Sequence, residues 1–142
     1  MSVAPSAVGG AAVERVVDGD TLRLAGVGRV RLIGIDTPEV EGHVEPCGEA
    51  ASAFVARLLA PGTRVRYRVG VEQRDRYGRL LAYVRLPDGR SLQRLLLERG
   101  YARPLTIPPN VERAAAFAAA AQEARAARRG IWASRPCSAS VP

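Results

Sequence analysis

The sequence predicts an α+β protein in which five short strands form an OB-type Greek-key β-barrel and three α-helices pack around it. β-prone segments come first, followed by one helix-forming segment, further β-prone segments and two more helix-forming ones. Glycine-bearing bends separate the β-prone segments, and a length of 142 residues allows one ordinary core but not two. We therefore expect one domain at residues 11–133, with a flexible leader at residues 1–10 and a tail at residues 134–142.

The first two strands are predicted to form a hairpin around Asp18-Gly19. β-prone residues lie on both sides of this pair, and Asp-Gly between such residues is a strong hairpin signal because glycine tolerates a positive φ. The turn places Asp20 at its rim.

The next strand is predicted from Val30 to Ile35 and ends at Asp36-Thr37-Pro38, because proline cannot continue a ladder. Strict alternation would put Arg31 and Asp36 on opposite faces, since they are five residues apart. We expect a β-bulge near Gly34 that brings the two side chains to one face.

A helix is predicted from Glu49, because apolar residues then recur at helical spacing up to Pro61-Gly62. The segment Thr63–Val69 alternates with period two, as expected for a strand, and places three arginines, Arg64, Arg66 and Arg68, on one face. These arginines could form a basic strip beside a phosphate groove or a solvated strand face, and we favour the solvated face.

The second half of the chain begins with a charged turn at Arg74–Arg79, followed by a strand at Leu80–Leu86. Two helices are predicted after this strand. Ser91 is expected to cap a helix at Leu92–Arg99, Asn110 is expected to cap a helix at Val111–Arg129, and a glycine follows each helix. Trp132 is expected to dock the end of the last helix on the body.

The charge balance indicates a polyanionic partner such as nucleic acid. The formal net charge is +7, the sequence pI is about 10.6, and all 21 basic residues are arginines. Arginine usage of this kind also arises from a GC-rich genome. No segment has the apolar length of a membrane span, so we expect no membrane partner. We also expect a monomer.

The acids at the ends of the first strands indicate a hard-cation site. Two carboxylates brought together from neighbouring strands repel each other unless a cation or a shared proton lies between them. Oxygen ligands without paired histidine or cysteine suit Ca²⁺ or Mg²⁺ rather than zinc. Asp18, Asp20 and Asp36 could also be ordinary turn and capping acids, but Arg31 and Glu39 beside them favour a site.

Three blocks resemble the signature segments of the staphylococcal nuclease (thermonuclease) family: Asp18–Thr21, Arg31–Glu39 and Asp75–Tyr83, in this order. The resemblance covers about Val13 to Trp132. It implies an OB-type barrel and a calcium-dependent nuclease that acts on DNA and RNA, preferably single-stranded. It also implies cleavage of the bond to the 5′ oxygen, which leaves 3′-phosphorylated products.

The chemistry of phosphodiester hydrolysis and the resemblance give the same roles to the matching residues. A dication polarises a phosphoryl oxygen, and arginines stabilise the charge that develops during attack. We expect Asp20 and Asp36 to hold the dication by side chain and Thr37 by its carbonyl, Arg31 and Arg79 to hold the phosphate, and Glu39 to orient or deprotonate water. The resemblance further implies that the dication is Ca²⁺ and that Arg76 and Tyr77 bind substrate.

The chain departs from the family pattern at Leu105-Thr106-Ile107, where secreted members carry base-contacting tyrosines. Base stacking there is expected to be weaker, by about 1–3 kcal/mol for each lost aromatic side chain. A non-catalytic OB module that binds single-stranded nucleic acid is the main alternative function. A protein-interaction barrel is a third, but it leaves the acids and arginines of the three blocks unexplained.

Cys47 and Cys137 leave the compartment open. In an exported protein they could form a disulfide that ties the loop after the site to the tail, whereas in a reducing cytosol both would be free thiols. We expect a secreted or periplasmic protein if a signal peptide has been removed, and a cytoplasmic one otherwise.

Overall fold

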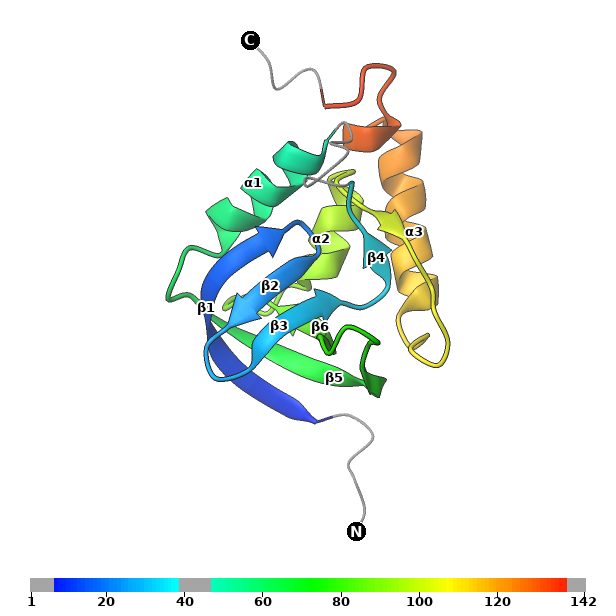
Figure 1. Ribbon diagram of the computed structural model, residues 1–142. Coiled ribbons are helices and arrows are strands. Elements are labelled where there is room, and N and C mark those ends of the chain that lie inside the picture. Colours follow the sequence, from blue (N-terminus) through cyan, green and yellow to red (C-terminus); the bar gives the residue numbers. More distant parts are fainter. Residues whose placement is uncertain (1–6, 39–46, 138–142) are drawn as a thin grey trace.

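The computed structural model describes residues 7–38 and 47–137, and its central feature is a closed five-stranded barrel (Figure 1). The barrel strands, in spatial order, are β1 (Val8–Asp18), β2 (Thr21–Leu24), β3 (Gly28–Leu32), β6 (Leu80–Arg85) and β5 (Arg64–Arg74). Neighbouring strands are antiparallel except β3 and β6, which are parallel. The barrel and the three helices around it confirm the predicted α+β fold of the OB type.

The helices are α1 (Gly48–Leu58), α2 (Leu92–Glu98) and α3 (Ala114–Ala126), followed by a 3₁₀ turn, η1 (Gly130–Trp132). In Figure 1, α1 lies beside the upper end of β1, α2 lies behind the barrel, and α3 runs along the other side. The Ser91 side chain accepts a hydrogen bond from the Arg94 N–H, which confirms the predicted cap of α2. None of the described helices is long and apolar enough to cross a membrane.

One continuous core fills the barrel and the space beneath the helices. The inward-facing strand residues alternate with exposed ones, as the period of a strand requires, and include Leu22, Leu24, Val30 and Leu32. The apolar face of α2 adds the fully buried Leu92, Leu96 and Leu97. Below about 150 residues, a single core of this kind is the normal source of stability.

The first strand begins earlier than the sequence predicted. Residues 8–10, expected to belong to the leader, pair with residues 66–68 of β5 and so belong to the barrel. Gly9 lies directly against the ring of Tyr67, where a Cβ would come within 2.5 Å of the ring. Gly9 therefore permits close packing of β1 against β5, and residues 8–10 do not belong to the flexible leader that we had expected.

Asn110 does not cap the last helix, which begins four residues later at Ala114. Its buried side-chain amide instead accepts a hydrogen bond from the Glu72 N–H at 2.9 Å and donates one to the Glu72 carbonyl at 3.0 Å. An asparagine amide carries both a donor and an acceptor, so it can pair with a strand as another backbone would. Asn110 thus fixes the loop before α3 to β5.

Cys47 and Cys137 form a disulfide, with their Cα atoms 5.3 Å apart. The bond joins the residue before α1 to the segment after η1. It connects positions 90 residues apart in the sequence.

Candidate active site

The hairpin of β1 and β2 positions the first two acids. Asp18 pairs with Thr21, so the two-residue loop is Gly19-Asp20, one position later than the predicted Asp-Gly turn. The φ of Gly19 is not positive, contrary to the reason for which we expected glycine there. A Cβ on Gly19 would lie 2.9 Å from the Thr37 side chain, so glycine lets the segment after β4 approach the hairpin.

A turn at Ile33-Gly34 separates β3 from β4 (Ile35–Asp36), which leaves the barrel and pairs with β7 (Arg103–Pro104). Gly34 has a φ of 86°, a conformation that favours glycine. The predicted irregularity is therefore present at Gly34, but it is a turn between two strands and not a bulge within one. It brings Asp36 back towards Arg31.

Arg31 lies between two carboxylates. Its Nη1 donates hydrogen bonds to the carbonyls of Leu32 at 2.7 Å and Ile35 at 2.8 Å, which fix the plane of the guanidinium and brace the turn. Its Nη2 is 3.3 Å from Asp36 Oδ1 and 3.4 Å from Asp20 Oδ2. The Arg31 and Asp20 side chains are only 14% and 10% exposed, so their contact forms in a partly desolvated place where charge interactions are strong. The Asp36 side chain is 59% exposed, so solvent screens its contact with Arg31.

Asp20 is held as a carboxylate by its surroundings. Burial alone would raise its pKa, but a hydrogen bond with Asp18, the Arg31 charge and the Thr37 N–H, 3.1 Å from Asp20 Oδ2, keep that pKa below the ordinary value. Burial and the neighbouring Asp20 instead raise the pKa of Asp18 to about 7. Without a metal, repulsion between the two carboxyls is relieved by a proton held on Asp18.

The donor set fits a hard dication with few protein ligands. Two carboxylates, from Asp20 and Asp36, lie beside the single guanidinium of Arg31, with the Asp18 carboxyl next to Asp20, so one positive charge does not fully neutralise these acids. Within the described residues, no three acidic, histidine or cysteine side chains are close enough together to form a complete ligand group. Two carboxylates with a backbone carbonyl and water are a common environment for Ca²⁺ or Mg²⁺.

Asp75 holds the turn before β6 together by binding Tyr77 and Arg79. Asp75 Oδ1 accepts the N–H groups of Tyr77 and Arg79, and Oδ2 accepts Arg79 Nε at 2.7 Å. Burial would raise the pKa of Asp75, but these N–H groups hold it below the ordinary value. Tyr77 is 61% exposed, and the guanidinium carbons of Arg76 and Arg79 lie 5.0 and 5.3 Å from the centroid of its ring.

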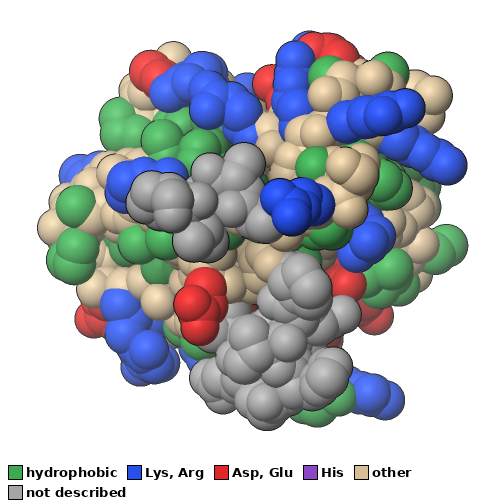
Figure 2. All heavy atoms as spheres, turned by 90° about the horizontal axis from the view of Figure 1, so that it is seen from above, with side chains coloured by type: hydrophobic (Ala, Val, Ile, Leu, Met, Phe, Trp, Pro, Cys, Tyr) green, Lys and Arg blue, Asp and Glu red, His purple; other side chains and the backbone are tan. Residues whose placement is uncertain are grey.

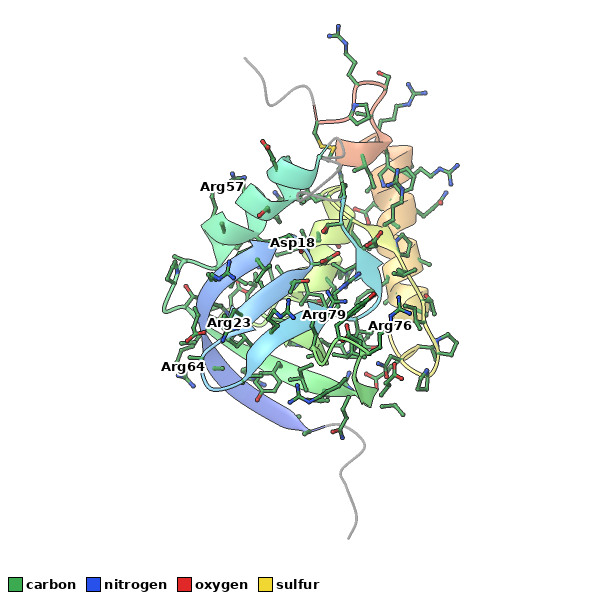
Figure 3. All side chains as sticks on the ribbon, viewed as in Figure 1. Asp18, Arg23, Arg57, Arg64, Arg76 and Arg79 are labelled. Atoms are coloured by element: carbon green, nitrogen blue, oxygen red, sulfur yellow. A yellow bond between two sulfur atoms is a disulfide. The ribbon has the colours of Figure 1, made fainter. Side chains whose placement is uncertain are left out.

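The parallel pairing of β3 and β6 places the two catalytic candidates on one face. Arg31 pairs with Leu81, and Arg79 lies two residues before Leu81, so their side chains share a face. Strand spacing and rise put their Cα atoms about 8 Å apart. Figure 3 shows Arg76 and Arg79 together on the right of the barrel, and Asp18 at the upper end of β1.

Not every predicted site residue is in the described ranges. Glu39, the expected general base, lies outside them. The segment expected to lack base-stacking side chains borders the site, because the Leu105 N–H donates to the Gly34 carbonyl at 2.9 Å. Leu105 and Ile107 are 39% and 57% exposed, so two aliphatic side chains face solvent there.

Gln93 supports the site and was not predicted from the sequence. Its side chain is fully buried on α2, and its Nε2 donates to the carbonyls of Ile33 and Ala82 at 3.3 and 3.0 Å. Its Oε1 accepts the Val84 N–H at 3.2 Å. The only signal in the sequence is a glutamine among the leucines of a short amphipathic helix.

The fold and the site together define an OB-type barrel with an acid- and arginine-lined candidate active site at the ends of its strands. The model of the family described as "Staphylococcal nuclease homologue" matches residues 29–134. The chain therefore belongs to this family.

Individual proteins are similar to this chain over most of its length. The thermonuclease of Staphylococcus intermedius is 42% identical over 126 residues, which cover 84% of this chain and 74% of that protein. Endonuclease YhcR of Bacillus subtilis (strain 168) is 35% identical over 84% of this chain, which corresponds to 11% of that much longer protein. The succinoglycan biosynthesis protein ExoI of Rhizobium meliloti (strain 1021) is 36% identical over 89% of this chain and 68% of its own length.

Proposed function

We propose that this protein is a calcium-dependent nuclease that hydrolyses phosphodiester bonds in DNA and RNA and leaves 3′-phosphorylated products. Membership of the staphylococcal nuclease family, with relatives named thermonuclease and endonuclease, makes the chain a phosphodiester-hydrolysing nuclease. The observation that carries the finer proposal is Arg31 fixed by two carbonyls between Asp20 and Asp36.

Asp20 and Asp36 would hold the ion by side chain and Thr37 by its backbone carbonyl. When bound, calcium would polarise a phosphoryl oxygen and offset the negative charge that builds during attack. The two carboxylates would then need Arg31 less as a counter-ion, and its Nη2 would be free to contact the phosphate. The hydrogen bonds from Nη1 to the Leu32 and Ile35 carbonyls keep the guanidinium oriented for that contact.

Arg79 would hold the same phosphate from the neighbouring strand. Its Nε is bound to Asp75, which orients the guanidinium and leaves the two terminal amino groups to bind oxygens in a two-pronged way. Glu39 would orient or deprotonate the attacking water. Arg76 and Tyr77 would bind the adjoining nucleotide.

Two observations support a single-stranded substrate and a monomer. The exposed Tyr77 ring, flanked by two arginines, is suited to stack on an unpaired base. The barrel is closed, so its five strands leave no free edge to pair with another copy. The disulfide supports a secreted or periplasmic location, because such bonds persist in oxidising compartments.

The test is cleavage of heat-denatured DNA with Ca²⁺ and with a chelator, using wild type, Arg31→Ala and Glu39→Ala. We expect cleavage only with the metal, and a loss of about 10²–10³-fold in each variant. Arg57→Ala, which removes an exposed arginine of α1 (Figure 3), is the matched control and should cleave as wild type does. Treatment of the products with a phosphatase should release phosphate from their 3′ ends.

The variants must first be shown to be folded by circular dichroism. A wild type that binds DNA but leaves it intact under every divalent ion tried would make the protein a non-catalytic OB module.

A further inference from the structure

A basic hollow lies on the outer face of β5 and β6, between α2 and α3, with a volume of about 490 Å³. Strand residues form its floor and the two helices form its walls. Its arginines are Arg66, Arg68, Arg85, Arg90, Arg94 and Arg113. We call these six residues and the hollow that they line the arginine groove.

The arginine groove has more positive charge than its acids neutralise. Arg94 pairs with Glu98 at 2.9 Å, Arg90 with Asp88 at 2.8 Å, and Arg68 with Glu112. Six arginines against three acids leave a net of three positive charges.

Arg66 and Arg85 have no acidic partner among the described residues, although Arg85 donates to the Gly89 carbonyl at 2.8 Å. These two arginines lie directly opposite each other across β5 and β6. Like charges in opposed positions of an antiparallel pair destabilise a sheet. An anion bound between them would remove that cost.

Basic charge alone does not mark a site in this protein, because arginines also lie at several separate places on the face shown in Figure 2. Arg23 and Arg29, for example, are opposed across β2 and β3. There, however, Glu14 pairs with Arg23 at 3.1 Å, and neither arginine lines the groove. The arginine groove combines a hollow shape with arginines that lack acidic partners.

The position of the groove suits a strand that also reaches the candidate active site. Arg79 precedes β6 and Arg85 ends it, a separation of about 20 Å at the rise of a strand. One OB barrel engages about 4–16 nucleotides, enough to cover that distance. Tyr83 also lines the groove, with Arg68 at 5.1 Å from its ring centroid, so the floor offers apolar as well as charged surface.

We propose that the arginine groove binds the phosphate backbone of single-stranded nucleic acid at a distance from the bond that is cleaved. The inference rests on the proposed function for the choice of nucleic acid over other polyanions. We had expected the basic face of β5 to be a solvated strand face. Under this proposal it anchors long substrates.

The test measures binding of a labelled 16-nucleotide single strand by fluorescence anisotropy, in a chelator and over a range of salt concentrations. We expect Arg66→Gln/Arg85→Gln to weaken binding about tenfold at low salt. The slope of log affinity against log salt should fall by about 1.4, because two phosphate contacts are lost. The control Arg23→Gln/Arg29→Gln removes the same charge from another opposed pair and should bind as wild type does.

Cleavage with Ca²⁺ supplies a second readout. In the groove variant, KM for the 16-nucleotide strand should rise about tenfold with kcat unchanged, and cleavage of a dinucleotide should be unaffected. If the wild type binds the strand without cleaving it, and only the groove variant loses binding, the proposed function fails but the groove proposal holds. The groove proposal fails if the groove variant binds as wild type does or both variants lose equally. It also fails if a 16-residue oligoglutamate displaces the labelled strand as well as unlabelled DNA does.

Discussion

Arg31 shows how one side chain can organise a site. Its Nη1 contacts two carbonyls and its Nη2 lies near two carboxylates, so one half of the guanidinium sets geometry and the other half carries charge. Lysine would keep the charge but could not make both sets of contacts in one plane. The residue therefore couples the turn at Ile33-Gly34 to the charge balance of the acids.

The same charge balance gives a prediction for Asp18→Asn. The pKa of Asp18 is about 7 in the folded protein and 3.8 in the unfolded chain, so the folded state holds the proton more tightly. The stability that this proton contributes is complete below about pH 4 and is lost as the pH rises through 7. In a chelator, Asp18→Asn should therefore be more stable than wild type at pH 8, and the difference should vanish at pH 4.

The full pKa shift corresponds to about 4 kcal/mol, but Asp18 is only half-buried and solvent screens it, so we expect about 1–2 kcal/mol. Urea unfolding of both proteins at pH 4 and pH 8 measures this difference in the free energy of unfolding. Asp88→Asn is the control, because the pKa of this exposed acid is lowered by its hydrogen bonds to Arg90, and its removal should give no gain at pH 8. Equal stability of Asp18→Asn and wild type at pH 8 would show that the ionised Asp18 carboxylate does not destabilise the fold and that its pKa is not raised.

At the scale of elements, the sequence predicts what local chemistry decides. The hairpin at Asp18–Thr21, the break at Gly34 and the Ser91 cap depend on residues close together in the chain. The role of Asn110 depends on Glu72, 38 residues away, and helix-capping preference alone predicted it wrongly. The buried glutamine of α2 has partners in the turn after β3 and in β6, which the period of a helix cannot reveal.

We predict that Gln93→Leu destabilises the protein by about 2–4 kcal/mol, because the Ile33 carbonyl and the Val84 N–H lose a buried partner. The turn that Arg31 braces should loosen, so cleavage should fall even at temperatures where the variant is folded. Urea unfolding and a cleavage assay measure the two effects. Gln122→Leu, at an exposed position of α3, is the control and should leave both unchanged.

A normal unfolding midpoint for Gln93→Leu would contradict the expected loss of stability, and unchanged cleavage would show that the site does not depend on this side chain.

At the scale of the whole molecule, the ends of the helices meet on one side of the barrel. The Ile131 N–H donates to the Gly100 carbonyl at 2.8 Å, which joins the segment after α3 to the segment after α2. A Cβ on Gly100 would lie 2.2 Å from the Arg129 carbonyl oxygen, so only glycine allows this approach. The disulfide joins the same region to the start of α1, and Figure 1 shows η1 close to that helix end.

The disulfide closes a loop that contains α1, two barrel strands and everything after them, so its loss should be felt globally. For a loop of about 90 residues the loop-closure model gives about 4–5 kcal/mol, and measured losses are about 2–5 kcal/mol. We predict that Cys47→Ala/Cys137→Ala lowers the free energy of unfolding by 2–5 kcal/mol. Reductant should destabilise wild type by the same amount and leave the double variant unchanged. Equal stability of wild type with and without reductant would show that the bond contributes nothing to the fold, and would remove the support for an oxidising compartment.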